Sequence, residues 1–336
     1  MEQDKVKITE VAGIAGVSIA TVSRVLNRKG GVSQKTRQQV ERVMAELGYD
    51  RGSTQGIVGV ITPGLTIPVF GVMAEKIGLA LAPHGLRAVI CPAIPGGVQE
   101  RDFLRSLIDL GATAVVFCSA SNTLDTFDPE VLHLLKTRGM PYVCLNGAFD
   151  GASAFSSDDA YAAELSVHHL HQLGHRRIGM AAGPVGNRPA DRRVEGFCAV
   201  MDKLGIPRAE DLVVRQTYSV EGGQFATERL LAQDVTAIMA CSDQMALGAI
   251  RAIRRRGLDV PGDVSVIGYD DGPLMEFTDP PLTTVRQPVD RLATEVARHL
   301  TSKLSGRQVP TGELLFQPEV VVRGTTGPHP RPAALG

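Results

Sequence analysis

The chain has 336 residues, a length that predicts two to three domains at roughly 150 residues each. Hydrophobic residues make up 43% and charged residues 21%, which is ample material for a core and excludes a disordered chain. No apolar run approaches the roughly 18 residues that span a bilayer, and residues 1–10 hold no stretch that could act as a signal peptide. We therefore expect a globular protein that stays in the cytoplasm.

The charges are unevenly distributed along the chain, although Lys and Arg (35) nearly balance Asp and Glu (36). Residues 1–48 carry eight basic and five acidic groups, a balance of +3, which leaves the remainder at −4. A small basic head on a larger acidic body indicates that only the head meets a polyanion.

The five cysteines occur singly, without a Cys-x-x-Cys pair, and most of them lie in apolar segments. Such cysteines are typical of buried core thiols, so we assign them no catalytic or metal-binding role. They are Cys91, Cys118, Cys144, Cys198 and Cys241.

Residues 7–48 are predicted to form three short helices that pack on one another, because none is long enough to fold alone. The first, over residues 8–15, has an apolar stripe of helical period and is ended by Gly16. Ser18 and Ser33 are expected to cap the second and third helices. The inward residues of these two helices are Val22, Val25 and Leu26, and Val40, Val43, Met44 and Leu47.

The pattern is that of a helix-turn-helix, and the outer face of its second helix carries the chemistry. Small or short polar residues there let the helix axis approach base edges in a major groove about 12 Å wide. Arg24 is long enough to reach a guanine or a phosphate. The alternative is a helical subdomain that docks on the body.

A linker, DRGSTQG at residues 50–56, separates these helices from a body in which apolar runs alternate with helix-like stretches. This alternation predicts repeated βα units and two doubly wound parallel-sheet lobes, with a ligand crevice at the carboxyl ends of the strands. The strand AFSS is placed in the second lobe, and EVVVRG is expected to return to the first. We predict an all-α helix-turn-helix headpiece at 1–49, an α/β body at 57–325 with lobes at 57–150 plus 280–325 and at 151–279, and a disordered tail at 326–336.

ITEVAGIAGVSIATVSRVLN closely resembles the DNA-binding signature of the lactose-repressor (LacI/GalR) family. The similarity continues through SQKTRQQVERVMAELGY and through body segments such as HLHQLGHRRIGMAAGP, RRVEGF and PPLTTVRQP, in the family's order. The resemblance implies a transcription regulator, generally a repressor, with a body like that of periplasmic sugar-binding proteins. It also implies a homodimer on a palindromic operator.

By this resemblance, seven residues of the headpiece contact DNA. Those that read bases specify the sequence, and those that contact phosphates position the helix. The expected base readers are Ile19, Ala20 and Arg24, and the expected phosphate contacts are Ser18, Thr21, Ser23 and Asn27.

One departure from the family concerns the joint between headpiece and body. Family members usually carry a longer joint there, with a helix whose leucine wedges into the minor groove and kinks the DNA. DRGSTQG replaces that joint, and no leucine lies between Tyr49 and Ile57. We predict that this chain lacks the hinge helix and its leucine intercalation.

The family's effector positions map onto a set of polar and aromatic residues in the body. Arg193 and Asp270 would form the principal hydrogen-bonding pair, with a mutual salt bridge as the alternative. Tyr218 falls where a stacking aromatic is common, although a core tyrosine is the alternative, and Asn146 falls where aspartate is frequent. The low aromatic content, 4% with no tryptophan, favours a small effector over an oligosaccharide.

Two further positions complete the expected effector site. Ser242 stands where the family usually has asparagine, which changes the reach of the pocket, and Phe70 is placed on its other wall. Asp243 and Gln244 are expected to cap the following helix rather than touch the ligand.

An enzyme has to be considered, because four histidines cluster in HHLHQLGH. No carboxylate or cysteine lies beside them in the sequence, Gly174 is expected to end the helix before His175, and no phosphate loop or nucleophile elbow is present. We therefore expect no catalysis, metal or cofactor. The four residues are His168, His169, His171 and His175.

Binding proteins of two kinds have to be considered as well. A solute-binding protein for transport is disfavoured by the intact helix-turn-helix and the missing signal peptide. A cytoplasmic ligand-binding protein with a weakened head is disfavoured by the complete outer face of the second helix. The expected function is a repressor of a carbohydrate catabolic operon that a small sugar-like effector releases, and a regulator that needs a corepressor stays open. No long heptad follows the last strand, so no C-terminal tetramerisation helix is expected.

Overall fold

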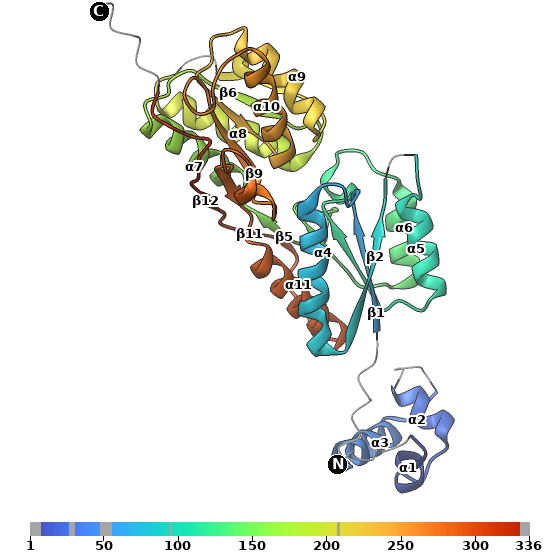
Figure 1. Ribbon diagram of the computed structural model, residues 1–336. Coiled ribbons are helices and arrows are strands. Elements are labelled where there is room, and N and C mark those ends of the chain that lie inside the picture. The colour runs from blue at the N-terminus through green and yellow to red at the C-terminus, as the bar shows by residue number, and fades with distance from the viewer. Residues whose placement is uncertain (1–7, 27–30, 48–55, 95, 207–208, 330–336) are drawn as a thin grey trace, which may run out of the picture. The chain divides into compact units, whose positions relative to one another are not determined.

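The structure, a computed structural model, describes residues 8–26, 31–47, 56–94, 96–206 and 209–329. It contains two compact units, one built on the three N-terminal helices and one that holds both β-sheets (Figure 1).

The headpiece contains α1 (Ile8–Ile14), α2 (Ile19–Leu26) and α3 (Gln34–Glu46). α1 ends before Gly16, which takes the left-handed φ of +62° that glycine tolerates. The three helices pack on one another around a core that includes Val11, Val22 and Val40, all fully buried. The three predicted helices are confirmed. Of the predicted inward residues of α2 and α3, Val22, Val25, Val40 and Val43 are buried, and Met44 and Leu47 are half-buried. The predicted linker, apart from Gly56 at the start of the first strand, lies outside the described residues, so the predicted absence of a hinge helix stays a prediction.

Each sheet of the body has six strands. The first has the order β11-β5-β4-β3-β1-β2, and the second has the order β12-β10-β9-β8-β6-β7. In the first sheet β11–β5, β5–β4, β4–β3 and β3–β1 are parallel pairs. In the second sheet β12 is antiparallel to β10, and β10–β9, β9–β8, β8–β6 and β6–β7 are parallel. The strands are β1 (Gly56–Thr62), β2 (Leu86–Pro92), β3 (Ala114–Cys118), β4 (Tyr142–Leu145), β5 (Ser153–Ser157), β6 (Ile178–Ala182), β7 (Val213–Arg215), β8 (Ala237–Ala240), β9 (Ser265–Asp270), β10 (Thr284–Arg286), β11 (Gly312–Phe316) and β12 (Glu319–Val321).

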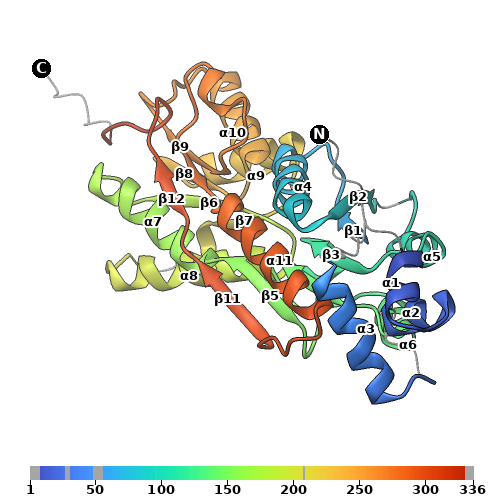
Figure 2. The same cartoon turned by 90° about the horizontal axis from the view of Figure 1, so that it is seen from below.

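Helices lie on both faces of each sheet, which is the doubly wound arrangement predicted (Figures 1 and 2). In the first lobe α4 packs against α11 and α5 against α6, and in the second lobe α7 packs against α8 and α9 against α10. The helices are α4 (Pro68–Leu81), α5 (Glu100–Asp109), α6 (Pro129–Arg138), α7 (Asp159–Gln172), α8 (Arg188–Lys203), α9 (Val220–Leu231), α10 (Asp243–Arg255) and α11 (Val289–Leu304). Single 3-10 turns are η1 (Ala82–His84), η2 (Ser121–Thr123), η3 (Ala209–Leu212) and η4 (Met275–Phe277).

Three strands lie in the lobe opposite to the expected one. β5, which contains AFSS, pairs with β4 in the first sheet. β10, in the stretch 280–325 that was assigned to the first lobe, pairs with β9 in the second sheet, and β12, the start of EVVVRG, pairs with β10 there. The chain therefore crosses between the lobes three times, after β5, after β10 and after β11. β11, which was not predicted, takes the edge of the first sheet beside β5 (Figure 2).

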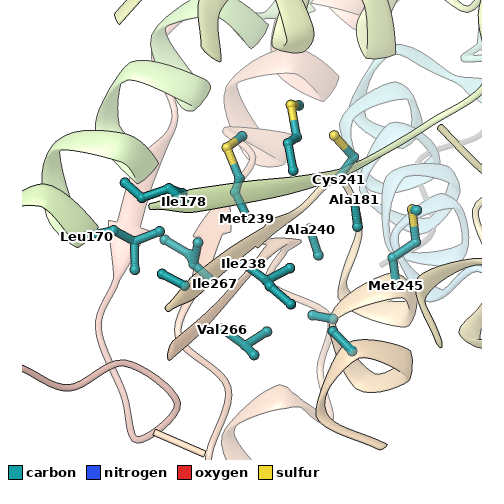
Figure 3. Close-up of a cluster of buried hydrophobic side chains, with 14 of the residues drawn as sticks. Leu170, Ile178, Ala181, Ile238, Met239, Ala240, Cys241, Met245, Val266 and Ile267 are labelled. Carbon is teal, nitrogen blue, oxygen red and sulfur yellow. The ribbon is translucent and has the colours of Figure 1, made fainter. Parts of the chain in front are cut away.

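The two lobes have separate apolar cores. Figure 3 shows the core of the second lobe, where residues from β6, β8 and β9 such as Ile178, Ile238 and Ile267 are fully buried. The core of the first lobe includes Phe117 and Phe149, whose rings meet edge to face at 5.0 Å. Four cysteines are buried and Cys198 is half-buried, and burial raises the pKa of the Cys118 thiol to about 12. The cysteines are thus the core thiols that the sequence predicts.

The first residues of the predicted tail are held by hydrogen bonds. The Gly327 amide donates to Ser265 Oγ at 3.0 Å, and the His329 amide donates to the Leu173 carbonyl at 2.8 Å. Residues 326–329 are therefore part of the folded body, contrary to expectation, because they satisfy buried polar groups of the second lobe. Residues 330–336 lie outside the described residues. In the described part of the chain, no helix is both long and apolar enough to cross a membrane.

Candidate DNA-binding face and effector cavity

The outer face of α2 presents the residues expected to contact DNA. Ile19 is 49% exposed, Ala20 and Arg24 are exposed, and Thr21 and Ser23 are half-buried. Val22 and Val25 point into the headpiece core, which fixes the opposite face outward. Asn27, the last of the expected contacts, lies outside the described residues.

Ser18 starts α2 and holds its first turn. Its Oγ accepts the Thr21 amide at 3.1 Å and bonds the Thr21 hydroxyl at 2.8 Å. This confirms the predicted cap. Ser33 makes the same two bonds with Thr36 at the start of α3, at the same distances.

A cavity of about 540 Å³ lies in the body and is lined by both lobes. This volume falls within the roughly 300 to 1,000 Å³ of ligand pockets. The residues expected at the effector site are spread over more than 200 positions of the chain, yet all of them line this one cavity. They are Phe70, Asn146, Arg193, Tyr218, Ser242 and Asp270.

Arg193, on the first half of α8, is buried and held on every side. Its Nε donates to the Pro189 carbonyl at 3.0 Å, its Nη1 to the Cys241 carbonyl at 2.9 Å and its Nη2 to Tyr218 Oη at 3.0 Å. The guanidinium also lies 4.2 Å from the centroid of the Tyr269 ring, a cation–π contact.

The carboxylate that pairs with Arg193 is Asp159, not Asp270. Asp159 Oδ1 lies 3.4 Å from Arg193 Nε, and the side chain accepts a bond from Tyr269 Oη at 3.3 Å. Burial raises the pKa of the Asp159 carboxyl to about 6, although the Arg193 charge opposes the rise. Asp159 was missed in the sequence analysis. The feature that could have indicated it is its position next to Asp158, directly after a buried strand.

Asp270, at the carboxyl end of β9, faces the cavity from a strained backbone with φ +120°. Its Oδ1 accepts a bond from Gln287 Nε2 at 2.7 Å. Burial and the nearby Asp243 carboxylate raise the pKa of Asp270 well above its ordinary value. Gln287 also lines the cavity and was missed, although it lies in the quoted segment TVRQP.

Two further residues of the cavity wall, Ser242 and Asn146, bond to the protein, as does Asp243 beside the wall. Ser242 Oγ accepts the Met245 amide at 3.2 Å and so caps α10. Asp243, expected to be the cap, is the first helical residue and accepts bonds from the Gly272 amide and the Thr284 hydroxyl instead. Asn146 donates to Ser119 Oγ and accepts from the Ser157 amide.

Two of the four clustered histidines have ordinary structural partners. His175 is fully buried and bonds Thr236, Ser265 and the Gly327 carbonyl, and His169 bonds the Thr326 hydroxyl at 2.9 Å. α7 ends at Gln172, before Gly174, as expected. Within the described ranges, no group of three or more His, Cys, Asp or Glu side chains could hold a metal ion.

Comparison with known proteins gives one consistent result. The model of bacterial regulatory proteins of the lacI family matches residues 7–51, and that of a periplasmic binding protein-like domain matches residues 167–326. The HTH-type transcriptional regulator MalR of Streptomyces coelicolor is 43% identical, over 96% of this chain and 97% of its own.

Two solved structures are similar to this chain over nearly its whole length. The transcriptional regulator CelR–cellobiose complex superposes with a TM-score of 0.73 at 30% identity, over 95% of this chain and 99% of that one. The lac repressor dimer bound to operator and the anti-inducer ONPF gives 0.70 at 29% identity, over 96% and 100%.

Proposed function

Because the chain belongs to the lacI family of bacterial regulatory proteins and is a DNA-binding transcriptional regulator, we propose that it represses a carbohydrate catabolic operon. It binds a palindromic operator as a homodimer, and a small sugar-like effector in the body cavity releases it. The expected contact residues of α2 meet the DNA, and the six predicted cavity residues meet the effector.

The observation that carries this proposal is the convergence of six dispersed residues on one cavity between the lobes. A ligand held by both lobes favours one arrangement of them, and a ligand shifts an equilibrium only through such differential contacts. The cellobiose in the similar CelR structure supports a carbohydrate. The coupling between effector and DNA is then about 1 to 3 kcal/mol and reciprocal.

Selection of bound sequences from a randomised duplex pool, at fixed physiological salt, tests the DNA half of the proposal. Salt is fixed because phosphate contacts alone can mimic affinity. An enriched palindrome is expected, with half-sites spaced for a two-fold dimer. No enrichment, with ligand binding intact, would identify a ligand-binding protein with a weakened head.

Titration of a sugar panel against the protein–operator complex tests the effector half. A sugar that lowers operator affinity supports release by an inducer, and a sugar that raises it would establish a corepressor instead. Arg24→Ala is expected to relax specificity at one base position by about 1 to 3 kcal/mol. Arg42→Ala, which removes the same charge from an exposed site on α3, is the control and leaves the specificity profile unchanged.

A further inference from the structure

The two cationic side chains among the described residues that line the cavity are already paired with carboxylates. Arg193 pairs with Asp159, and Arg101 Nη1 lies 3.1 Å from Asp128 Oδ2. Each nitrogen of the Arg193 guanidinium also donates to a protein oxygen. An anionic ligand would therefore have to displace these partners before it met a free positive charge.

Two buried acceptors of the same cavity lack a donor. Asp159 Oδ2 and Gln287 Oε1 have no hydrogen-bond partner in the described part of the chain, and their residues are 3% and 7% exposed. Buried acceptors are rarely left unpaired, because they have lost their bonds to water. Hydroxyl groups of a ligand are suitable donors.

Two further carboxyl groups of the lining have no arginine partner among the described residues. Asp270 bonds an amide, and Glu100 accepts two bonds from Ser121, so neither of these carboxylates pairs with either arginine of the lining in the described structure. In a desolvated cavity a further negative charge would be repelled more strongly than in water.

Part of the cavity wall is apolar. Ile67, Phe70, Ile94 and Phe127 of the first lobe line this part, and polar residues of both lobes line the rest. The ligand that fits therefore carries both hydroxyl groups and an apolar face.

We propose that the cavity selects an uncharged polyhydroxylated ligand and rejects its phosphorylated or carboxylated counterparts. Ligand hydroxyls donate to Asp159 Oδ2 and Gln287 Oε1. Anions are excluded because both arginines of the lining already pair with carboxylates and because the lining holds further carboxyl groups. This inference rests on the proposed function in one respect, namely that the ligand of the cavity is the effector.

Calorimetric titration of the full-length protein with matched sugar pairs tests this selectivity. The probes are glucose and glucose 6-phosphate, trehalose and trehalose 6-phosphate, and cellobiose and cellobionate. The neutral member of at least one pair should bind, with a Kd at least about tenfold below that of its anionic partner, the equivalent of about 1.4 kcal/mol. Equal or tighter binding of an anionic member, or no binding by any of the six, would overturn the proposal.

Two substitutions separate the acceptor from the charge. Gln287→Leu removes the unpaired acceptor and is expected to weaken the neutral sugar about tenfold, while Gln172→Leu, at an exposed position outside the cavity, has no effect. Asp270→Asn removes one of the carboxyl groups that disfavour an anion but can still accept at its amide oxygen, so the ratio of anionic to neutral Kd should fall. Thermal unfolding confirms that each variant folds, and an unchanged ratio in Asp270→Asn argues against the proposal.

The failure of this inference and that of the proposed function have different signatures. If a neutral sugar binds but leaves operator affinity unchanged, the selectivity stands and the regulatory role fails. If an anionic sugar changes operator affinity and its neutral partner does not, the regulatory role stands and the selectivity fails.

Discussion

Arg193 shows how one buried charge can serve both stability and binding. The guanidinium and the Asp159 carboxylate are nearly excluded from water, so each compensates the other. Arg193→Ala leaves an unpaired buried carboxylate and should lower the free energy of unfolding of the body by about 3 to 5 kcal/mol, as measured by urea denaturation.

The pH dependence of that loss identifies its cause. Asp159 can escape the penalty by taking up a proton, so the destabilisation should be smaller at pH 5 than at pH 8. Arg193→Ala combined with Asp159→Asn should recover part of the loss. A double variant no more stable than the single one would show that lost packing dominates.

His175 gives a second dependence on pH. Burial lowers its pKa below the ordinary value of 6.5, and the charges of His329, His169 and Arg176 act in the same direction, while the Gly327 carbonyl opposes them. The folded state then binds fewer protons than the unfolded state. The contribution of the neutral ring is complete above about pH 6.5 and is lost as the pH falls below it.

His175→Gln should therefore flatten the fall in unfolding free energy between about pH 7.5 and pH 5.5. Urea denaturation at several pH values measures this slope, and His133→Gln, on the exposed side of α6, is the control. An unchanged slope would mean that other groups govern acid sensitivity.

At the scale of elements, the two serine caps of the headpiece form a matched pair. Ser18→Ala and Ser33→Ala each remove the same two bonds and should each cost about 1 kcal/mol of helix stability. Hydrogen exchange at the core amides of Val22 and Val40 measures this loss. If Ser18 also contacts a phosphate, Ser18→Ala lowers operator affinity more than Ser33→Ala does. An equal loss of operator affinity in the two variants would show that Ser18 only caps α2.

The helices were predictable from the sequence to within a few residues, because their periodic stripes and end residues act locally. α1, predicted over residues 8–15, spans Ile8–Ile14. The lobe of a short strand was not predictable in this way. β5 and β12 resemble other apolar runs, and only pairing with distant partners assigns each to its sheet.

The residues of the candidate site likewise fall into those that were predictable from the sequence and those that were not. Residues within the family-like motifs, such as Arg193 and Asp270, were located from the sequence and line one cavity. Asp159 and Gln287 were missed, since their unpaired acceptors become evident only when segments 128 positions apart meet in the fold. The Asp159–Arg193 ion pair likewise depends on the packing of α7 against α8.

At the scale of the whole body, the lobes are joined by three crossovers and by side-chain links. Arg192, on α8 of the second lobe, forms an ion pair at 2.5 Å with Glu313, on β11 of the first. Gln244 Nε2, on α10, donates to the Thr66 carbonyl of the first lobe at 2.8 Å. These links hold the lobes together around the cavity.

Glu313→Gln should weaken the link between the lobes, because it removes the charge that pairs with Arg192 and is only partly exposed to solvent. We expect a larger radius of gyration of the ligand-free protein in small-angle scattering and a Kd for the bound neutral sugar raised about tenfold, as open states compete with binding. Glu319→Gln is the matched control, since Glu319 pairs with Arg286 within the second lobe. Of these two ion pairs, Arg192–Glu313 joins the two lobes and Arg286–Glu319 does not. Equal changes in both variants would therefore contradict a role for the Arg192–Glu313 pair in lobe closure.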